Sequence, residues 1–172
     1  MKNINFTILL VEDDLNDQFL IKAAFRKIGV TDPIQVVGNG EEALAYLQGE
    51  GQFADRETFQ YPTFILMDLK MPKMDGFAVL AHLKKNPQWA IIPTVIFSAS
   101  SDLDDIKQAY LLGASSYHIK PGSPEEMRKQ LKLLYDYWMT CEIPQVDSSG
   151  KHLPTISRGK MGERFAGSVN NG

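Results

Sequence analysis

Five short apolar segments alternate with longer amphipathic segments along this chain. The apolar segments are almost continuously hydrophobic, which is typical of strands that are covered on both faces. They lie at Ile8–Val11, Ile34–Val37, Phe64–Met67, Thr94–Phe97 and Ser116–Ile119. Strand and helix repeated five times predict an α/β fold with a parallel sheet and right-handed crossovers.

Capping residues mark the starts of the predicted helices. A side-chain oxygen at such a position accepts a hydrogen bond from a backbone N–H that the first turn leaves unpaired. Suitable residues occur at Asp14, Asn39, Asp75 and Ser123. Ser123 gives the strongest signal, because Pro124 follows at the first helical position and Glu126 lies three residues beyond the cap.

Apolar residues at helical spacing predict the face that each helix buries. They are Leu15, Phe19, Ala23 and Phe25–Ile28 in the first helix, Leu103, Ile106 and Tyr110 in the fourth, and Met127, Leu131, Leu134 and Trp138 in the last. Gly29 is expected to end the first helix, since glycine readily adopts the left-handed conformation of a C-terminal cap.

Two segments fall outside the strand–helix alternation. Gly49–Pro62 is longer than a typical connection, so we expect a surface loop or a helix extension there. From Ile143 onward the chain is rich in Gly, Ser and Asn and has no clear period. We therefore expect one domain over residues 1–140 and a flexible or partner-ordered tail over residues 141–172.

Composition narrows the class of protein. The net charge of −3 gives no general attraction to nucleic acid or to an anionic membrane. A single cysteine, Cys141, allows no internal disulfide and fits a reducing compartment. No apolar run approaches the ~18 residues of a membrane span, and the N-terminal segment lacks the pattern of a signal peptide. We expect a cytoplasmic protein.

Polar groups follow the ends of the predicted strands. In open α/β sheets, ligands bind beyond the carboxyl ends of the strands, so these groups are expected to share one site. They are Glu12, Asp13 and Asp14, then Asn39, then Asp68, then Ser98, then Lys120. Any one of them has an ordinary explanation, because an Asp that closes a strand is most often a turn former or a helix cap.

The charges of this set predict a particular chemistry. Glu12, Asp13 and Asp68 would repel one another unless a hard cation relieved the repulsion, and Mg²⁺ favours a few carboxylates together with water and phosphate oxygens. A carboxylate such as Asp68, flanked by a cation and Lys120, is a nucleophile that can form an acyl phosphate. Mg²⁺ would then bind one phosphoryl oxygen, Lys120 another, and the Ser98 hydroxyl or nearby backbone N–H groups a third.

Several of these assignments have alternatives. Ser100 and Ser101 compete with Ser98 for the role of the phosphoryl-binding hydroxyl. Tyr117 is equally explained as a packed aromatic residue. A cis bond before Pro121 would fix the backbone of the preceding lysine in a tight turn.

The ordered set of motifs resembles the receiver domain of two-component response regulators. The resemblance extends from about Thr7 to about Met139. Its motifs are Val11-Glu12-Asp13-Asp14, Met67-Asp68 through Asp75-Gly76, Phe97-Ser98-Ala99 and Tyr117-His118-Ile119-Lys120-Pro121. It implies a flavodoxin-like, doubly wound (βα)5 fold with strand order 2-1-3-4-5.

The resemblance also implies a role for each site residue. Asp68 would accept a phosphoryl group from a sensor histidine kinase or a histidine phosphotransfer protein. Mg²⁺ would be held by Asp13, Asp68 and the backbone carbonyl of Lys70, with Glu12 acting through water. Ser98 and Tyr117 would form the switch, and Lys120 would contact the phosphoryl group. Such a protein is a signalling switch that catalyses only its own phosphorylation and dephosphorylation.

Further segments resemble the small single-domain regulators that partner bacterial and cyanobacterial phytochromes. They are Gly49–Arg56, Ile92-Pro93 and Asp105–Tyr110. This likeness implies a phytochrome-type kinase as partner, and a homodimer through the fourth helix, fifth strand and fifth helix. Lys70 departs from the subgroup, in which Asn is common at that position. Its side chain is expected to pair with the phosphoryl group or to block attacking water.

Other functions fit the sequence less well. A receiver-like binding module that works without phosphorylation remains an alternative. A haloacid-dehalogenase-type phosphatase needs a second Asp where this chain has Lys70, and a flavin protein needs a Gly- and hydroxyl-rich loop where this chain has Glu12-Asp13-Asp14. The roughly 30 residues after Thr140 lack two periodic helices, so a helix-turn-helix output domain is not expected.

Overall fold

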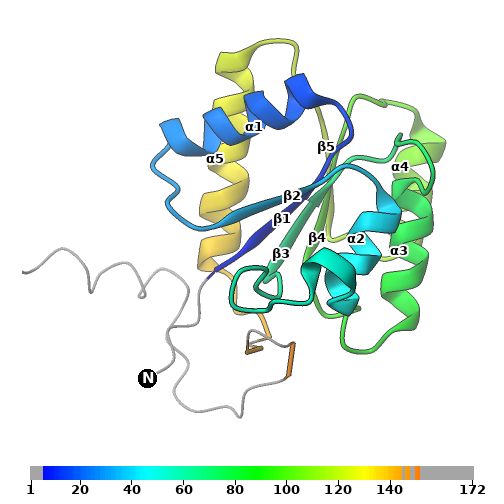
Figure 1. The fold of residues 1–172 in the computed structure, drawn as a ribbon. Helices are drawn as coiled ribbons and strands as arrows, with labels where there is room; N and C mark the ends of the chain where they lie inside the picture. The colour runs from blue at the N-terminus through cyan, green and yellow to red at the C-terminus, as the bar shows by residue number, and fades with distance from the viewer. Residues whose placement is uncertain (1–5, 145, 148–149, 152–172) are drawn as a thin grey trace, which may run out of the picture.

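A five-stranded parallel sheet forms the centre of the molecule (Figure 1). The computed structural model describes residues 6–144, 146–147 and 150–151. The strands are β1 (Ile8–Val11), β2 (Ile34–Val37), β3 (Phe64–Met67), β4 (Thr94–Ser98) and β5 (Ser116–Ile119). All four pairings are parallel and the order is β2-β1-β3-β4-β5, which confirms the expected flavodoxin-like topology.

Helices cover both faces of this sheet (Figure 1). They are α1 (Leu15–Lys27), α2 (Gly40–Gln48), α3 (Gly76–Lys85), α4 (Leu103–Leu111) and α5 (Pro124–Thr140), with a 3-10 helix η1 (Gly51–Phe53) after α2. Helices α1 and α5 pack on one face, and α2, α3 and α4 lie on the other. The alternating side chains of β1 separate two cores: Ile8 and Leu10 belong to the α1/α5 side, and Leu9 and Val11 to the opposite side.

The expected capping residues all cap their helices. Asp14, Asn39, Asp75 and Ser123 each accept a hydrogen bond from a backbone N–H in the first turn of α1, α2, α3 and α5. Gly29 has φ +87°, a left-handed conformation that suits the end of a helix.

The buried faces of α1 and α4 differ from those expected. Leu15 and Phe19 are 77% and 71% exposed, whereas Phe25 is buried as expected, together with Ile21 and Ala24. In α4, Leu103 is 80% exposed, and the fully buried residue is Ala109. In α5 the expected stripe of Met127, Leu131 and Leu134 is buried, and Trp138 is partly buried.

The segment after α2 is more structured than a surface loop. Phe53 and Phe59 pack edge-on with ring centroids 5.3 Å apart, and both rings contact Tyr46. The Arg56 guanidinium lies over the rings of Tyr46 and Tyr61, at 5.7 and 5.8 Å. These aromatic residues belong to, or pack against, the core on the α2 side of the sheet.

Part of the expected tail contacts the same region. Val146 is 7% exposed and belongs to the core on the α2 side. Gly150 lies so close to Tyr61 that a Cβ atom there would be 2.7 Å from the ring. Residues 145, 148–149 and 152–172 lie outside the described residues, so the expectation of a flexible or partner-ordered tail over 141–172 stays a prediction.

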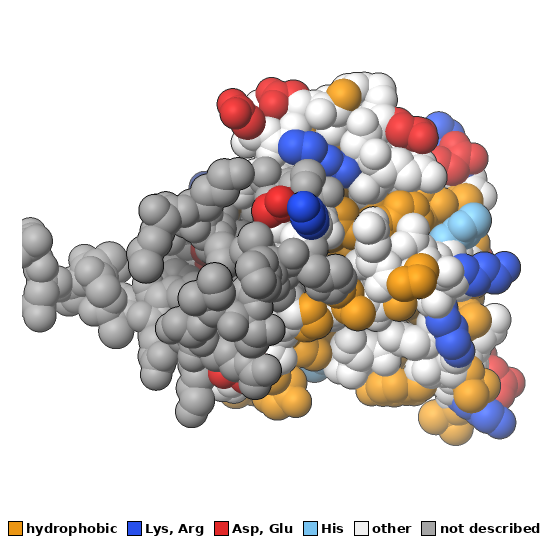
Figure 2. Space-filling model, turned by 90° about the horizontal axis from the view of Figure 1, so that it is seen from below, with side chains coloured by type: hydrophobic (Ala, Val, Ile, Leu, Met, Phe, Trp, Pro, Cys, Tyr) orange, Lys and Arg blue, Asp and Glu red, His pale blue; other side chains and the backbone are white. Residues whose placement is uncertain are grey.

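The end of the molecule at which the strands begin is seen from below in Figure 2. Apolar side chains are visible over much of the uncovered part of this face, with Lys and Arg side chains near its margin.

Among the described residues, no helix is long and apolar enough to cross a membrane.

Candidate functional site

Strand register brings the chemically active residues to one edge of the sheet. Val11 pairs with Met67, so the acids that follow them, Glu12 and Asp68, leave adjacent strands at the same level. Their positions are fixed by the sheet ladder, because the Asp68 N–H donates to the Val11 carbonyl at 3.0 Å. At the ends of β4 and β5, the Lys120 N–H donates to the Ser98 carbonyl at 2.8 Å.

Three carboxylates converge at this edge. One ligand oxygen from each of Glu12, Asp13 and Asp68 lies within 4.8 Å of the other two. Glu12 is 1% exposed and Asp68 8%, whereas Asp13 is open to solvent. Oxygen donors grouped in this way suit a hard divalent cation, with room for water on the Asp13 side. The structure therefore fits the expected metal site, at the residues that sequence reasoning selected for it.

Lys120 supplies the positive charge of the site. Its ammonium donates to Glu12 Oε2 at 2.6 Å, to Asp17 Oδ2 at 2.7 Å and to Asp68 Oδ2 at 3.1 Å. Burial disfavours the charged amine, but the hydrogen bonds that Lys120 donates to Asp17 and Glu12, together with the nearby Asp68 charge, outweigh this effect and raise the pKa of Lys120. Lys120 is therefore a permanent cation whose three donor hydrogens are all in use.

Glu12 is held in an environment that disfavours its charge. Burial raises the pKa of Glu12 to about 7, and the hydrogen bond and charge of Lys120 only partly oppose this shift. Its second carboxylate oxygen accepts a hydrogen bond from the Asp14 N–H at 3.0 Å. A cation at the site would favour the ionised form of this residue.

Asp17 is a member of the site that sequence reasoning missed. It lies in the first turn of α1, where an acidic residue is common because it interacts favourably with the helix dipole. Nothing in the local sequence distinguishes it from an ordinary acid in the first turn of a helix. Only the fold shows that Lys120, 103 residues away, reaches its carboxylate.

The Asp68 carboxylate is oriented through both of its oxygens. Oδ1 accepts a hydrogen bond from the Leu69 N–H at 2.7 Å, and Oδ2 accepts one from Lys120. The loop that follows passes close to the start of α3, where the Gly76 N–H donates to the Leu69 carbonyl at 2.9 Å. Asp68 is thus nearly buried, charge-compensated and held by rigid backbone, as a reactive carboxylate needs to be.

Ser98 and Tyr117 are joined through Ser100. Ser98 is fully buried, and its Oγ accepts a hydrogen bond from the Ser100 N–H at 3.3 Å. The Tyr117 hydroxyl donates to the Ser100 carbonyl at 2.8 Å. The loop after β4 therefore links the two residues that were expected to act together, and Tyr117 has a polar contact in addition to its packing. Their roles as a switch stay predictions.

Lys70 points to α4 in this structure. Its ammonium lies 3.1 Å from Asp105 Oδ2 and 5.6 Å from the centre of the Phe77 ring. Asp105 also accepts a hydrogen bond from Ser100 Oγ at 2.6 Å. Both the Ser100 hydroxyl and Lys70 lower the pKa of Asp105, in that order of importance. The expected contact of Lys70 with a phosphoryl group would require the side chain to leave this pair, in which it is 63% exposed.

The peptide bond before Pro121 is trans. Every described peptide bond is trans, so the alternative of a cis bond there does not apply. The backbone of Lys120 is fixed instead by the ladder hydrogen bond to Ser98 and by the capped start of α5 at Ser123.

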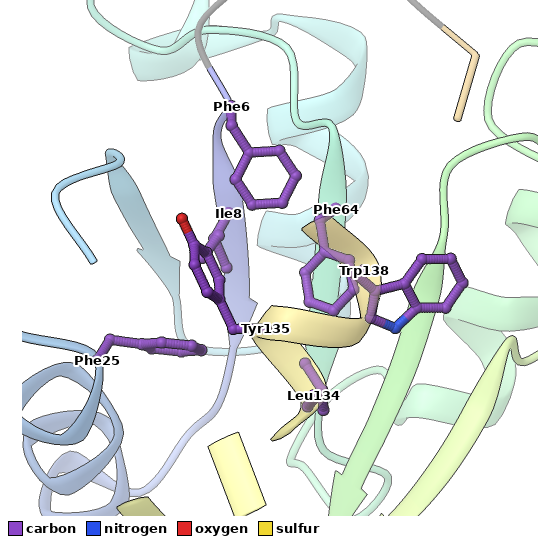
Figure 3. A pocket seen from close by; sticks show the side chains of 7 residues that line it. All are labelled: Phe6, Ile8, Phe25, Phe64, Leu134, Tyr135 and Trp138. Atoms are coloured by element: carbon purple, nitrogen blue, oxygen red, sulfur yellow. The ribbon is translucent and has the colours of Figure 1, made fainter. Parts of the chain in front are cut away.

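The structure also contains an apolar recess, away from the acidic site. It lies between α1, α5 and the beginnings of β1 and β3, and Figure 3 shows the side chains that line it. They are Phe6, Ile8, Phe25, Phe64, Leu134, Tyr135 and Trp138. The Tyr135 hydroxyl donates to Asp32 Oδ2 at 2.6 Å. These rings pack one another in tilted and edge-on contacts, so the recess belongs to the core, at the end of the sheet away from the acids.

Comparison with known proteins places this chain in a family. The family model "Response regulator receiver domain" matches residues 8–132. Two curated relatives are "Probable methanogenesis regulatory protein FilR2" of Methanothrix harundinacea (strain 6Ac) and "Response regulator Rcp1" of Synechocystis sp. (strain ATCC 27184 / PCC 6803 / Kazusa). The first is 36% identical and covers 78% of this chain and 84% of its own length, and the second is 32% identical and covers 80% and 92%.

Solved structures agree with the sequence relatives. The phosphorylated cyanobacterial phytochrome response regulator RcpA has a TM-score of 0.76 and 35% identity, over 82% of this chain and 99% of its own. The Mn²⁺-bound form of Rcp1 has a TM-score of 0.73 and 31% identity, over 81% and 99%. The family match spans most of the chain, and the resemblance drawn from the motifs is confirmed: this chain belongs to the response regulator receiver domain family of two-component signalling.

Proposed function

We propose that this receiver domain takes a phosphoryl group on Asp68, with a divalent cation bound, and thereby changes the surface that it offers to other proteins. The observation that carries the proposal is the Asp68 carboxylate, which is nearly buried, hydrogen-bonded to Lys120 and adjacent to two further acids. Phosphoryl transfer needs mainly positioning and charge stabilisation, and both are provided at this position.

The transfer step conserves atoms and charge in a simple way. A carboxylate oxygen of Asp68 forms a bond to phosphorus, and the bond from phosphorus to the donor group breaks. The donor, a phosphohistidine imidazole or the acetate of acetyl phosphate, leaves with the bonding electron pair. Loss of the signal is attack by water on phosphorus, which restores the Asp68 carboxylate and releases inorganic phosphate. Because the acceptor is the protein's own Asp68, we propose a signalling switch that catalyses only its own phosphorylation and dephosphorylation.

We propose Mg²⁺ as the cation, held by Asp13, Asp68 and the backbone carbonyl of Lys70, with Glu12 acting through water. The three clustered carboxylates support this assignment, as does the Mn²⁺ in the structure of the relative Rcp1. When bound, such an ion supplies positive charge to the phosphoryl oxygens. On the protein side, Lys120 provides a fixed cation beside the same carboxylate.

The switch is proposed to work through Ser98 and Tyr117. Phosphorylation adds roughly −1.5 to −2 charge where one carboxylate stood. The Ser98 hydroxyl is drawn toward that charge, and its contact with the Ser100 N–H loosens. Because Ser100 also accepts the Tyr117 hydrogen bond and contacts Asp105 of α4, the change spreads to the surface of α4 and β5.

We infer that the phosphoryl donor is a sensor histidine kinase or a histidine phosphotransfer protein, and we propose a phytochrome-type kinase first. RcpA is a phytochrome response regulator, which supports this order. The FilR2 relative is a methanogenesis regulatory protein, so other kinases belong in the same test. We also propose a homodimer through α4, β5 and α5, where Leu103, Tyr110 and Tyr137 are exposed. The single cysteine fits a reducing compartment, and we propose the cytoplasm.

The test is phosphotransfer from purified histidine kinases of the same genome to this protein. Transfer to the wild type and none to Asp68→Ala is the expected result. If no kinase transfers and acetyl phosphate with Mg²⁺ gives no Asp68-dependent labelling, the protein is a binding module that works without phosphorylation, and the proposal is wrong.

A further inference from the structure

Lys120 is bound more closely by Asp17 than by the proposed phosphoacceptor. The ammonium lies 2.7 Å from Asp17 Oδ2 and 3.1 Å from Asp68 Oδ2. A lysine has three donor hydrogens, and here they serve Glu12, Asp17 and Asp68. Any additional hydrogen bond from Lys120 to a phosphoryl oxygen must therefore replace or share one of these three.

We propose that Asp17 is a positioning residue that holds the Lys120 ammonium back from the phosphoryl site, and so lowers the stability of the phosphorylated state. This proposal rests on the proposed function, because it assumes that Asp68 carries the phosphoryl group. In this role, Asp17 of α1 restrains Lys120 and thereby opposes switching.

The three acids around Lys120 differ in what else can bind them. Glu12 and Asp68 belong to the carboxylate group that fits a cation, whereas Asp17 does not. A filled cation site therefore gives Glu12 and Asp68 a second positive partner, but leaves Asp17 paired with Lys120. The competition between Asp17 and the phosphoryl group for Lys120 is expected to persist when the cation is present.

Exposure sets the size of the restraint. The Asp17 side chain is 31% exposed, whereas those of Lys120 and Asp68 are each 9% exposed. Asp17 can be released to water without leaving a buried charge unpaired, so its hold on Lys120 is moderate. Partly exposed ion pairs of this kind are weak, and about a two- to fivefold effect on an equilibrium is to be expected.

A matched pair of variants isolates this contact. Asp17→Asn removes the charge at nearly constant shape. Asp14→Asn removes the same charge from the same end of α1, but Asn still caps the helix, and the ion pairs of Lys120 are with Glu12, Asp17 and Asp68. A general gain in affinity for anions would appear in both variants, whereas release of Lys120 would appear only in the first.

The experiment is a titration of the Mg²⁺-loaded full chain with beryllofluoride, a non-hydrolysing mimic of the phosphoryl group, followed by amide NMR shifts. The half-saturating concentration should be about two- to fivefold lower in Asp17→Asn than in Asp14→Asn, and at least as low in Asp17→Ala. Urea unfolding of the metal-free variants is measured in parallel. A residue with only a structural role would weaken both stability and beryllofluoride binding.

The outcomes separate this proposal from the function on which it rests. Tighter binding in Asp17→Asn than in Asp14→Asn supports the restraint. Equal or weaker binding overturns it, while a normal wild-type response leaves the proposed function intact. If the wild type gives no response that Asp68→Asn abolishes, the proposed function fails, and the restraint fails with it.

Discussion

Gly76, the first residue of α3, is the place where a single methyl group should disturb the phosphoacceptor loop. A Cβ atom at this position would lie 2.4 Å from the carbonyl oxygen of Asp68 and 2.9 Å from the Cα of Leu69. Both contacts are with backbone atoms, which cannot rotate away as a side chain can. Gly76→Ala must therefore push apart the start of α3 and the loop after β3.

The expected loss of stability can be estimated from these contacts. Overpacking of this kind costs about 1–3 kcal/mol, and alanine regains less than about 1 kcal/mol through its higher helix propensity. We expect Gly76→Ala to lower the free energy of unfolding by about 1–2 kcal/mol. Because Asp68 moves with its carbonyl, beryllofluoride binding should weaken as well.

Urea unfolding of the metal-free protein measures the effect. The matched control is Gly122→Ala, because a Cβ atom at Gly122 has no neighbour within 4 Å. The control should change the free energy of unfolding by less than about 0.5 kcal/mol. Equal stabilities of the two variants, with equal beryllofluoride affinities, would refute the argument that close backbone packing positions Asp68.

Three further changes test other parts of the structure. In EDTA, the free energy of unfolding in urea should fall as the pH rises from about 5 to 8. Folded Glu12, with its pKa raised to about 7, keeps a proton that the unfolded chain has already lost. The same pH dependence of stability in Glu12→Gln would show that Glu12 is not its source. Val146→Ala should lower the free energy of unfolding by about 1.6 kcal/mol, the transfer value of two buried carbon groups, since Val146 is 7% exposed; no loss would mean that the segment after α5 does not contribute to the core. Lys70→Asn should speed the loss of phosphate from Asp68, measured after removal of acetyl phosphate, with Lys73→Asn as the control in the same loop. An unchanged or slower rate would show that Lys70 does not shield the phosphoryl group.

The strands and capping residues could be predicted because their signals are local. A short apolar segment that ends in a turn former specifies a strand, and a side chain such as Ser123 before Pro124 specifies a helix start. The positions of Asp68 and Lys120 at one edge followed from the topology of parallel sheets, in which all carboxyl ends lie together.

The faces of α1 and α4 could not be chosen by periodicity alone. Helix α1 carries two apolar stripes, one with Leu15 and Phe19 and one with Ile21 and Phe25, and both have helical spacing. The second stripe is buried, because it meets the sheet and α5. In α4 the small residue Ala109 allows close approach to the sheet, whereas the larger Leu103 is left outside.

Contacts between distant side chains were also beyond the sequence signals. Asp17 has the appearance of an ordinary first-turn acid until the fold brings Lys120 to it. Ser100 was considered only as a competitor of Ser98, yet it connects Ser98, Tyr117 and Asp105 through three separate atoms. Such links depend on loop conformation, which local propensity does not determine.

The central claim is that Asp68 itself becomes phosphorylated. The direct test is to treat the Mg²⁺-loaded protein with acetyl phosphate, reduce the acyl phosphate with borohydride, and locate the reduced residue by peptide mass spectrometry. We expect one modified position, Asp68, and we expect the modification to be lost when Mg²⁺ is removed with EDTA and to be absent from Asp68→Asn. Modification at another acid, or none at Asp68 under conditions that label a known receiver domain, would contradict it.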